Sequence, residues 1–297
     1  MGDLTKVLED NEDLGDNCSD SSSVSTSYIF GVHSCDCSED EEDEDDDGES
    51  FEPFAWATFK NAPVQTSVIE KCDGTLYELM MMEFDTDKHL AWMSQVMFAL
   101  AYAQHNFAFT HNDLHANNVM YVKTEKEFYY YSSGGILYRV PTFGYLIKII
   151  DFERGTASIK LVGMKEPKLF MSDHFRPDEE AGGQYNYGEF NDPRYPEIKP
   201  NPSFDLVRLA TSLYTDLFPA KESDHLLHTL MKKWLTLEDG TSILFSKENH
   251  DRYHGFHLYK AIARFCKDNA VPRKEIMLLK DLYSVQTSNN HPVLMVD

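Results

Sequence analysis

One polar loop constrains the fold more than any other stretch of this sequence. The residues FTHNDLHANNVMY, at 109–121, follow a helix predicted over His89–His105, where apolar side chains recur at i, i+3 and i+4. Asp113 and Asn118 lie five residues apart on this tight segment, and Asp151 ends the apolar run YLIKIIDF that comes later. Phosphoryl transfer needs such a set, because one carboxylate orients the attacking hydroxyl and accepts its proton while oxygen ligands fix Mg²⁺.

These residues resemble the two signature motifs of the protein-kinase-like superfamily. The catalytic-loop pattern H-R-D-L-x-x-x-N is similar to His111–Asn118, and the metal-binding pattern D-F-G is similar to Asp151-Phe152-Glu153. The resemblance implies ATP and Mg²⁺ as cofactors and Asp113 as the catalytic base. It also implies Asn118 and Asp151 as metal ligands that bind the nucleotide through the ion.

Two flanking segments extend the resemblance. The sequence VIEKCDGTLYELM looks like the hinge that holds adenine, with Glu70, Lys71 and Cys72 as the residues whose backbone contacts the nucleotide. The sequence SFDLVRLATSL looks like the helix whose aspartate, here Asp205, braces the backbone of the catalytic loop.

The resemblance implies an α+β, protein-kinase-like fold with a mainly α-helical C-lobe and a truncated β N-lobe. Residues 1–50 are acidic and Ser-rich, and we expect them to be largely disordered because they have little apolar surface to bury. We expect residues 51–72 to hold remnant N-lobe strands and the hinge, and residues 73–297 to form the C-lobe. His115, where most kinases have lysine, is similar to haspin-like kinases. The insert before IKIIDF looks like that of serine/threonine kinases of large DNA viruses.

Parts of the kinase pattern are absent. No G-x-G-x-x-G occurs, and Lys6 is the only lysine in the first 59 residues, so neither a Gly-rich loop nor a strand lysine is recognisable. Asn112 replaces the arginine that usually receives an activation-loop phosphate, and Glu153 replaces the glycine of D-F-G. The expected function is transfer of the ATP γ-phosphate to a protein serine or threonine. The protein is inactive if the missing Gly-rich loop and strand lysine are essential. A pseudokinase that serves as a binding scaffold is the alternative.

Two further interpretations stay open. The motifs HNDL and IDFE also resemble choline and aminoglycoside kinases, although in those small-molecule kinases the bracing acid follows D-F-E closely. Here Asp205 lies 54 residues after Asp151. His111, Asp113 and His115 alternate, so on a strand they would share one face and bind zinc or iron. That interpretation leaves IIDF and SFDLVRLA unexplained.

Charge is concentrated in the first part of the chain. Residues 1–52 hold 19 acidic residues and one lysine, which is −18 of the net charge of −23. The rest is near neutral, which argues against a nucleic-acid partner. No apolar run of about 18 residues that could cross a membrane occurs, and no signal peptide is recognisable. We therefore expect an intracellular protein, cytoplasmic or nuclear, in a host cell or virion. Its partners are a nucleotide and a protein substrate of unassigned identity. Nine consecutive acids at 39–47 form a solvated spacer or a contact for a basic partner.

Local patterns predict the other elements. We expect a strand at Val64–Glu70, a turn at Asp73-Gly74 and then a helix capped by Thr75. Strands are expected at Asn117–Val122 and Tyr145–Phe152, with an extra hairpin between them. Residues 156–200 are expected to be irregular. Four segments with helical periodicity follow, namely SFDLVRLATSLYTDLF, DHLLHTLMKKWLTL, FHLYKAIARFCKDN and RKEIMLLKDLYSV.

Overall fold

The structure is a computed structural model that describes residues 29–34, 55–60, 66–247 and 250–297. The chain divides into two compact units, Met1–Ile69 and Glu70–Asp297. In the first unit, strand β1 (Ile29–Ser34) pairs antiparallel with β2 (Ala55–Lys60). The segment predicted to be disordered, with its nine-acid run, lies outside the described residues except for β1.

Two helices begin the core of the second unit. Thr75 caps α2 (Leu76–Met82) through a capping box, because its hydroxyl accepts from the Glu78 N–H while the Glu78 carboxylate accepts from the Thr75 N–H. Helix α3 (Thr86–Phe107) confirms the helix predicted over His89–His105 and is longer at both ends. Its buried apolar residues span more than about three turns, from Leu90 to Ala101, so α3 forms the centre of the core.

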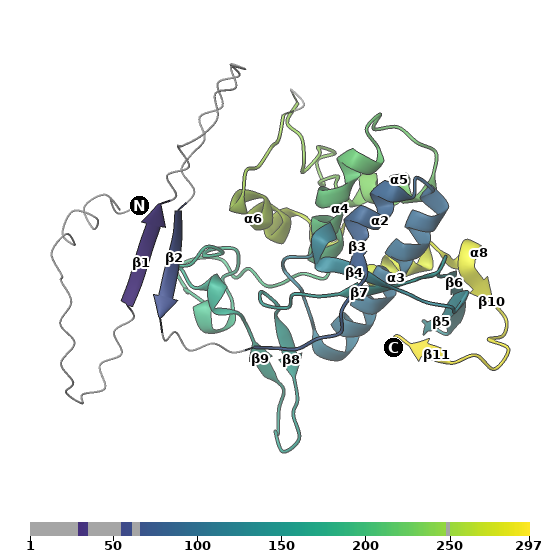
Figure 1. Cartoon of the computed structure of the whole chain (residues 1–297), viewed down its shortest axis with the longest axis horizontal. Coiled ribbons are helices and arrows are strands. Elements are labelled where there is room, and N and C mark those ends of the chain that lie inside the picture. The colour runs from purple at the N-terminus through teal and green to yellow at the C-terminus, as the bar shows by residue number, and fades with distance from the viewer. Residues whose placement is uncertain (1–28, 35–54, 61–65, 248–249) are drawn as a thin grey trace, which may run out of the picture. The chain divides into compact units, whose positions relative to one another are not determined.

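The remaining helices follow the long irregular segment, as the periodicity predicts. They are α4 (Phe204–Leu217), α5 (Leu226–Trp234), α6 (Phe256–Phe265), α7 (Pro272–Met277) and α8 (Lys280–Tyr283). The last predicted helical segment is thus divided into two short helices. Figure 1 shows α4 at the centre of this group, with α6 at one end of the unit.

A three-stranded sheet positions the polar loop. It consists of β3 (Gly74–Thr75), β4 (Val119–Lys123) and β7 (Tyr145–Ile149), in that spatial order and all antiparallel. The Gln95 side chain of α3 donates to the Tyr145 carbonyl at 3.1 Å and accepts from the Ile147 N–H at 3.0 Å. This amide holds β7 against the helix that precedes the loop.

The predicted extra hairpin is present and belongs to a second sheet. Strands β5 (Phe128–Ser133) and β6 (Ile136–Pro141) pair antiparallel, and Phe98 of α3 stacks on Tyr131 with 4.2 Å between ring centroids. The end of the chain completes the sheet, since β10 (Ser284–Val285) pairs with β6 and β11 (Val293–Met295) pairs with β5. Both edges of the hairpin are therefore covered (Figure 1).

The segment between β7 and α4 is mostly irregular, as expected. It contains a small hairpin of β8 (Ala157–Ile159) and β9 (Lys168–Phe170), which projects from the unit in Figure 1. Two single 3₁₀ turns follow, η2 (Asp173–Phe175) and η3 (Gly188–Phe190).

The strand predicted at Val64–Glu70 is wrong for the residues that the structure describes. Thr66–Glu70 form no strand, and the side chains of Val68 and Ile69 are 95% and 72% exposed. A β-prone composition is insufficient here because a strand needs a neighbour for its hydrogen bonds, and within the described part of the chain this segment has none.

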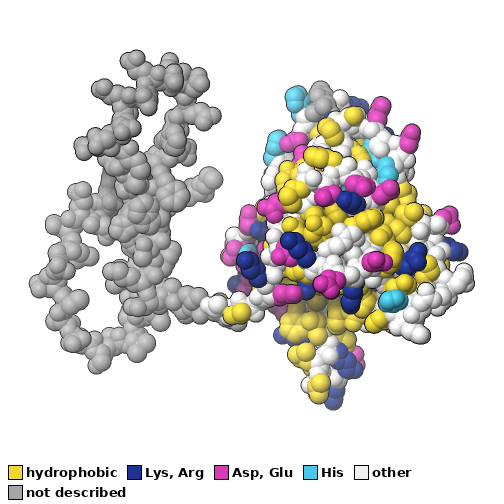
Figure 2. All heavy atoms as spheres, turned by 45° about the vertical axis from the view of Figure 1, so that its right-hand side comes forward, with side chains coloured by type: hydrophobic (Ala, Val, Ile, Leu, Met, Phe, Trp, Pro, Cys, Tyr) yellow, Lys and Arg dark blue, Asp and Glu magenta, His cyan; other side chains and the backbone are white. Residues whose placement is uncertain are grey.

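The surface of the second unit carries both signs of charge. On the face shown in Figure 2, Lys and Arg side chains are interspersed with Asp and Glu, with apolar patches between them. Among the described residues, none of the helices is both long enough and apolar enough to cross a membrane.

Candidate active site

Backbone contacts at both ends hold the loop at 109–121. Helix α3 ends at Phe107, and the residue that caps it, Ala108, has a φ of 46° in the left-handed region. Thr110 then pairs with Thr156 through two backbone hydrogen bonds, of 3.0 and 2.9 Å. The 3₁₀ turn η1 (Ala116–Asn118) leads directly into β4. The loop is therefore tied to the segment that follows Asp151.

His111 is a structural residue of the loop. Its ring is fully buried, and Nε2 lies 2.7 Å from the Ile150 carbonyl oxygen, to which it donates in the tautomer where Nδ1 accepts from the Asp113 N–H. The loop does not form a strand at this point, and no group of three or more His, Cys, Asp or Glu in the described ranges could hold a metal ion. The zinc or iron interpretation of this stretch is wrong.

The Asp205 carboxylate binds the backbone of the loop, as the resemblance implies. It lies in the first turn of α4 and is fully buried, and its two carboxylate oxygens accept from the backbone N–H of His111 at 2.9 Å and of Asn112 at 3.0 Å. Burial raises the pKa of the Asp205 carboxyl, while the charge of His111 and the two N–H donors act in the opposite direction. The loop backbone is thus fixed by a residue 94 positions away along the chain.

Asn112 links three segments through its side-chain amide. It has a left-handed φ of 68°, which asparagine tolerates better than most residues, and is 1% exposed. Its Nδ2 donates to the Arg154 carbonyl at 2.8 Å and to the Thr110 carbonyl at 3.2 Å, while its Oδ1 accepts from the Tyr185 hydroxyl at 2.5 Å. Burial raises the pKa of Tyr185, so this hydroxyl keeps its proton. Neutral hydrogen bonds of Asn112 therefore tie the loop both to Arg154 and to Tyr185.

Asp113, the predicted base, has two side-chain partners. Its Oδ1 accepts from the Tyr259 hydroxyl of α6 at 2.6 Å, and its Oδ2 lies 3.6 Å from Nη1 of Arg154. The Asp113 side chain is 19% exposed, and Arg154 also pairs with Glu180 at 2.8 Å. Burial lowers the pKa of the neighbouring His115, so its ring is less easily protonated than a free imidazole, although the Asp113 charge acts in the opposite direction.

The two predicted metal ligands lie at the ends of paired strands. The Asn118 carbonyl accepts from the Ile150 N–H at 3.0 Å, which places Asp151 one residue beyond a backbone-bonded pair. Asn118 donates Nδ2 to the Asp113 carbonyl at 3.0 Å, so its Oδ1 stays available. Asp151 is exposed, has a left-handed φ of 63°, and its carboxylate has no partner in the part of the chain that is described. These oxygens fit the donor set that Mg²⁺ prefers.

The residues after Asp151 contact the loop from the other side. Phe152 packs edge-on against Phe109 at 5.9 Å and tilted against His111 at 5.5 Å between ring centroids, although it is 57% exposed. The Glu153 carboxylate lies 3.6 Å from Nε2 of His174.

The predicted hinge residues Glu70, Lys71 and Cys72 lie just before β3 and have no regular secondary structure. Their backbone N–H and C=O groups make no hydrogen bond to any described residue, so they are available to a ligand. The Glu70 carboxylate pairs with Lys148 of β7 at 2.5 Å. The predicted hinge segment leads into β3 and the polar loop leads into β4, and these two strands are neighbours in one sheet.

Comparison with known proteins gives a partial match. The chain is similar to a protein of Acanthamoeba polyphaga mimivirus that is described as a "Putative serine/threonine-protein kinase", with 33% identity over 101 residues. The match covers 30% of this chain and 22% of the mimivirus protein, so the chain spans about a fifth of the length of that relative. No protein-family model matches the chain. This match indicates a distant kinase-like relationship.

Three residues of this kinase-like site were not predicted from the sequence. Tyr185 contacts Asn112, whereas Arg154 and Tyr259 contact Asp113. Arg154 directly follows IDFE, which is a usable signal. Tyr259 lies 146 positions from Asp113 and carries no local motif, so only the tertiary structure reveals it.

Proposed function

We propose that this protein transfers the γ-phosphate of ATP to a serine or threonine hydroxyl of a protein, with Mg²⁺. The observation that carries the proposal is the brace under the loop. The Asp205 carboxylate binds the backbone N–H groups of His111 and Asn112, while Asn118 binds the carbonyl of Asp113. The candidate base and the candidate metal ligand are thus held in one rigid loop, which is the preorganisation that phosphoryl transfer requires.

Each residue has a defined task in this proposal. Asp113 orients the acceptor hydroxyl and accepts its proton as the bond to phosphorus forms. Asn118 and Asp151 would hold Mg²⁺, which neutralises the developing charge on the phosphate oxygens when it is bound. The free backbone groups of Glu70–Cys72 would bind the adenine edge. The Asn112–Tyr185 hydrogen bond would keep the segment after Asp151 ordered without a phosphate.

A protein acceptor is favoured over a small molecule by the segment between Asp151 and Asp205. This segment is folded against the loop through the Asn112 contacts with Arg154 and Tyr185. It therefore resembles the activation segment of protein kinases, whereas small-molecule kinases place the bracing acid close to the metal ligand.

The first test is nucleotide binding by the full chain. We expect millimolar Mg·ATP to raise the melting temperature of the wild-type protein, and Asp151→Asn to abolish most of that rise. Asp178→Asn is the matched control, because Asp178 is exposed and has no described partner. The second test is phosphorylation of a serine/threonine peptide library, in which Asp113→Asn should lower the rate by at least 10²-fold. Undiminished transfer by Asp113→Asn would refute the assigned base.

A non-catalytic scaffold is the second candidate. It is favoured by the lack of a Gly-rich loop and of a lysine at positions 7–59, since both grip the phosphates in protein kinases. For a scaffold that does not use nucleotide, Mg·ATP at millimolar concentration should leave the melting temperature unchanged.

A further inference from the structure

The hydroxyl of Tyr259 lies as close to Asp113 as an acceptor hydroxyl would have to lie for Asp113 to act as its base. A general base has to be within about 2.6–3.2 Å of the hydroxyl whose proton it removes. Tyr259 fulfils this distance, because its oxygen is 2.6 Å from Oδ1 of Asp113. The other oxygen of Asp113 faces Arg154. The carboxylate oxygen of Asp113 that does not face Arg154 is thus already in contact with a hydroxyl of the same chain.

Neighbouring side chains hold Tyr259 in this position. Arg208 of α4 donates Nη2 to the Tyr259 hydroxyl at 2.9 Å, and its guanidinium lies 4.8 Å from the centre of the ring. Phe256, one turn earlier in α6, stacks on Tyr259 at 4.8 Å and lies beneath the guanidinium of Arg154 at 4.9 Å. Burial raises the pKa of Tyr259, so the hydroxyl remains a donor at neutral pH. These contacts make an ordered cover over Asp113.

The cover belongs to the less buried half of α6. Ala261, Ile262 and Ala263 are buried in the core and anchor the second half of the helix, whereas Phe256 and Tyr259 are only partly buried. The helix begins after Gly255, which has a positive φ of 51° and no side-chain cap for the first turn. The first turn and a half of α6 thus packs on the core only through partly buried side chains, and two of these, Phe256 and Tyr259, also contact the active site.

We propose that Tyr259 occupies the acceptor-hydroxyl position on Asp113 and thereby inhibits transfer, so that the first half of α6 must withdraw before a protein substrate binds. This inference rests on the proposed function. An incoming serine or threonine then replaces Tyr259 as the hydrogen-bond donor to Asp113. Arg208 has no carboxylate within ion-pair distance in the described part of the chain, and its Nε has no hydrogen-bond partner there. Loss of Tyr259 therefore frees its guanidinium, which favours an acceptor with an acidic side chain next to the target hydroxyl.

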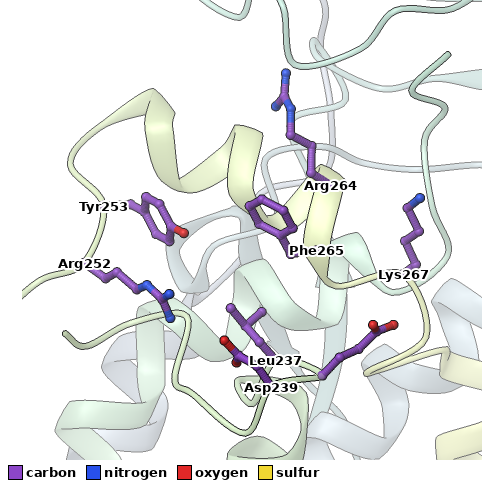
Figure 3. A pocket seen from close by; sticks show the side chains of 8 residues that line it. Leu237, Asp239, Arg252, Tyr253, Arg264, Phe265 and Lys267 are labelled. Atoms are coloured by element: carbon purple, nitrogen blue, oxygen red, sulfur yellow. The ribbon is translucent and has the colours of Figure 1, made fainter. Parts of the chain in front are cut away.

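Tyr259→Phe tests the inference, because it removes the hydroxyl and keeps the ring that packs on Phe256. The matched control is Tyr253→Phe. Figure 3 shows Tyr253 before α6, beside a cavity of about 380 Å³ that also has Arg252, Arg264 and Phe265 in its lining, and Tyr253 makes no contact with Asp113. The full-length proteins are compared in two measurements. One is transfer from Mg·ATP to a peptide library with a single serine or threonine, with and without adjacent aspartate. The other is labelling of Asp113 by a water-soluble carbodiimide with an amine, read by peptide mass mapping.

We expect Tyr259→Phe to raise transfer at subsaturating peptide by about tenfold, because a hydrogen bond to a charged group is typically worth at least this factor. It should also raise Asp113 labelling, whereas Tyr253→Phe should change neither. Unchanged labelling of Asp113 in Tyr259→Phe would show that the Tyr259 hydroxyl does not cover the base. Faster labelling together with unchanged or slower transfer would show that the contact between Tyr259 and Asp113 does not inhibit phosphoryl transfer. Both results overturn the inference. No transfer by any variant, with Asp113 labelled as expected, would instead refute the proposed function, and the inhibition would fall with it.

Discussion

Replacing Asp205 with asparagine removes the carboxylate that binds the loop backbone but keeps the shape of the side chain. The carboxylate accepts two backbone N–H groups, from His111 and Asn112, in a fully buried position. A hydrogen bond to a charged group contributes ~1.5–3 kcal/mol, and a buried donor left unpaired costs ~1–3 kcal/mol. Asparagine keeps one oxygen and presents an NH₂ group to the other donor. We therefore expect Asp205→Asn to lower the free energy of unfolding by about 2–4 kcal/mol.

Urea unfolding at pH 7 measures this loss, with Asp281→Asn as the control because Asp281 of α8 is exposed and has no hydrogen-bond or ion-pair partner among the described residues. Amide hydrogen exchange localises the effect, since the N–H groups of His111 and Asn112 should lose protection before the rest of the core does. If Asp205→Asn unfolds within about 0.5 kcal/mol of the wild type and both amides stay protected, then the carboxylate does not hold the loop.

Three further predictions follow from other parts of the unit. Mg·ATP should slow alkylation of Cys72 in the predicted hinge several-fold. The control is Cys266, which should react only in the unfolded chain because burial raises the pKa of its thiol to about 12. Equal labelling of Cys72 with and without nucleotide would argue against the hinge. Burial lowers the pKa of His89 below its ordinary 6.5. The contribution of His89 to the free energy of unfolding is therefore complete above about pH 6.5 and is lost as pH falls below that value. His89→Gln should reduce the difference between the urea midpoints measured at pH 7.5 and 5.5. Glu275→Ala should lower the free energy of unfolding by about 2–3 kcal/mol, because the Trp234 Nε1–H loses its partner in the core. In the wild type this N–H lies 2.8 Å from the Glu275 carboxylate. A loss below about 1 kcal/mol would mean that the indole finds another partner.

The parts of the fold that sequence predicts well are those decided by neighbours along the chain. Thr75 and Glu78 lie three residues apart, so their capping box is a local pattern. The helical state of α3 follows from the spacing of its apolar residues, and the hairpin between β4 and β7 follows from its Gly-containing turn. The predicted strand at Val64–Glu70 failed for the opposite reason, because only a pairing partner elsewhere in the chain could make it a strand.

The candidate site divides in the same way. Asp113, Asn118 and Asp151 are predicted from motifs, because phosphoryl-transfer chemistry fixes residue types and spacing, and their roles stay predictions. The brace from Asp205 is confirmed, and it could be inferred only because a second motif accompanied the first. Tyr259 could not be found, since a tyrosine on an amphipathic helix is most simply a packing residue, and nothing in its neighbourhood along the chain indicates that its hydroxyl reaches a carboxylate.

The pairing of the last strands with the extra hairpin links two regions that are otherwise far apart along the chain. β10 and β11 cover β6 and β5, Val296 donates to the Ser132 carbonyl at 2.9 Å, and the Asp297 carboxylate accepts from the Gly134 N–H at 2.9 Å. Neither region is a separable module, because removing the final strand would expose a long tyrosine-rich sheet edge, and removing the hairpin would leave the tail without a partner. Insert and tail are thus expected to be gained or lost together, so a relative with a short connection between its catalytic loop and its metal-binding motif should also lack this closing strand.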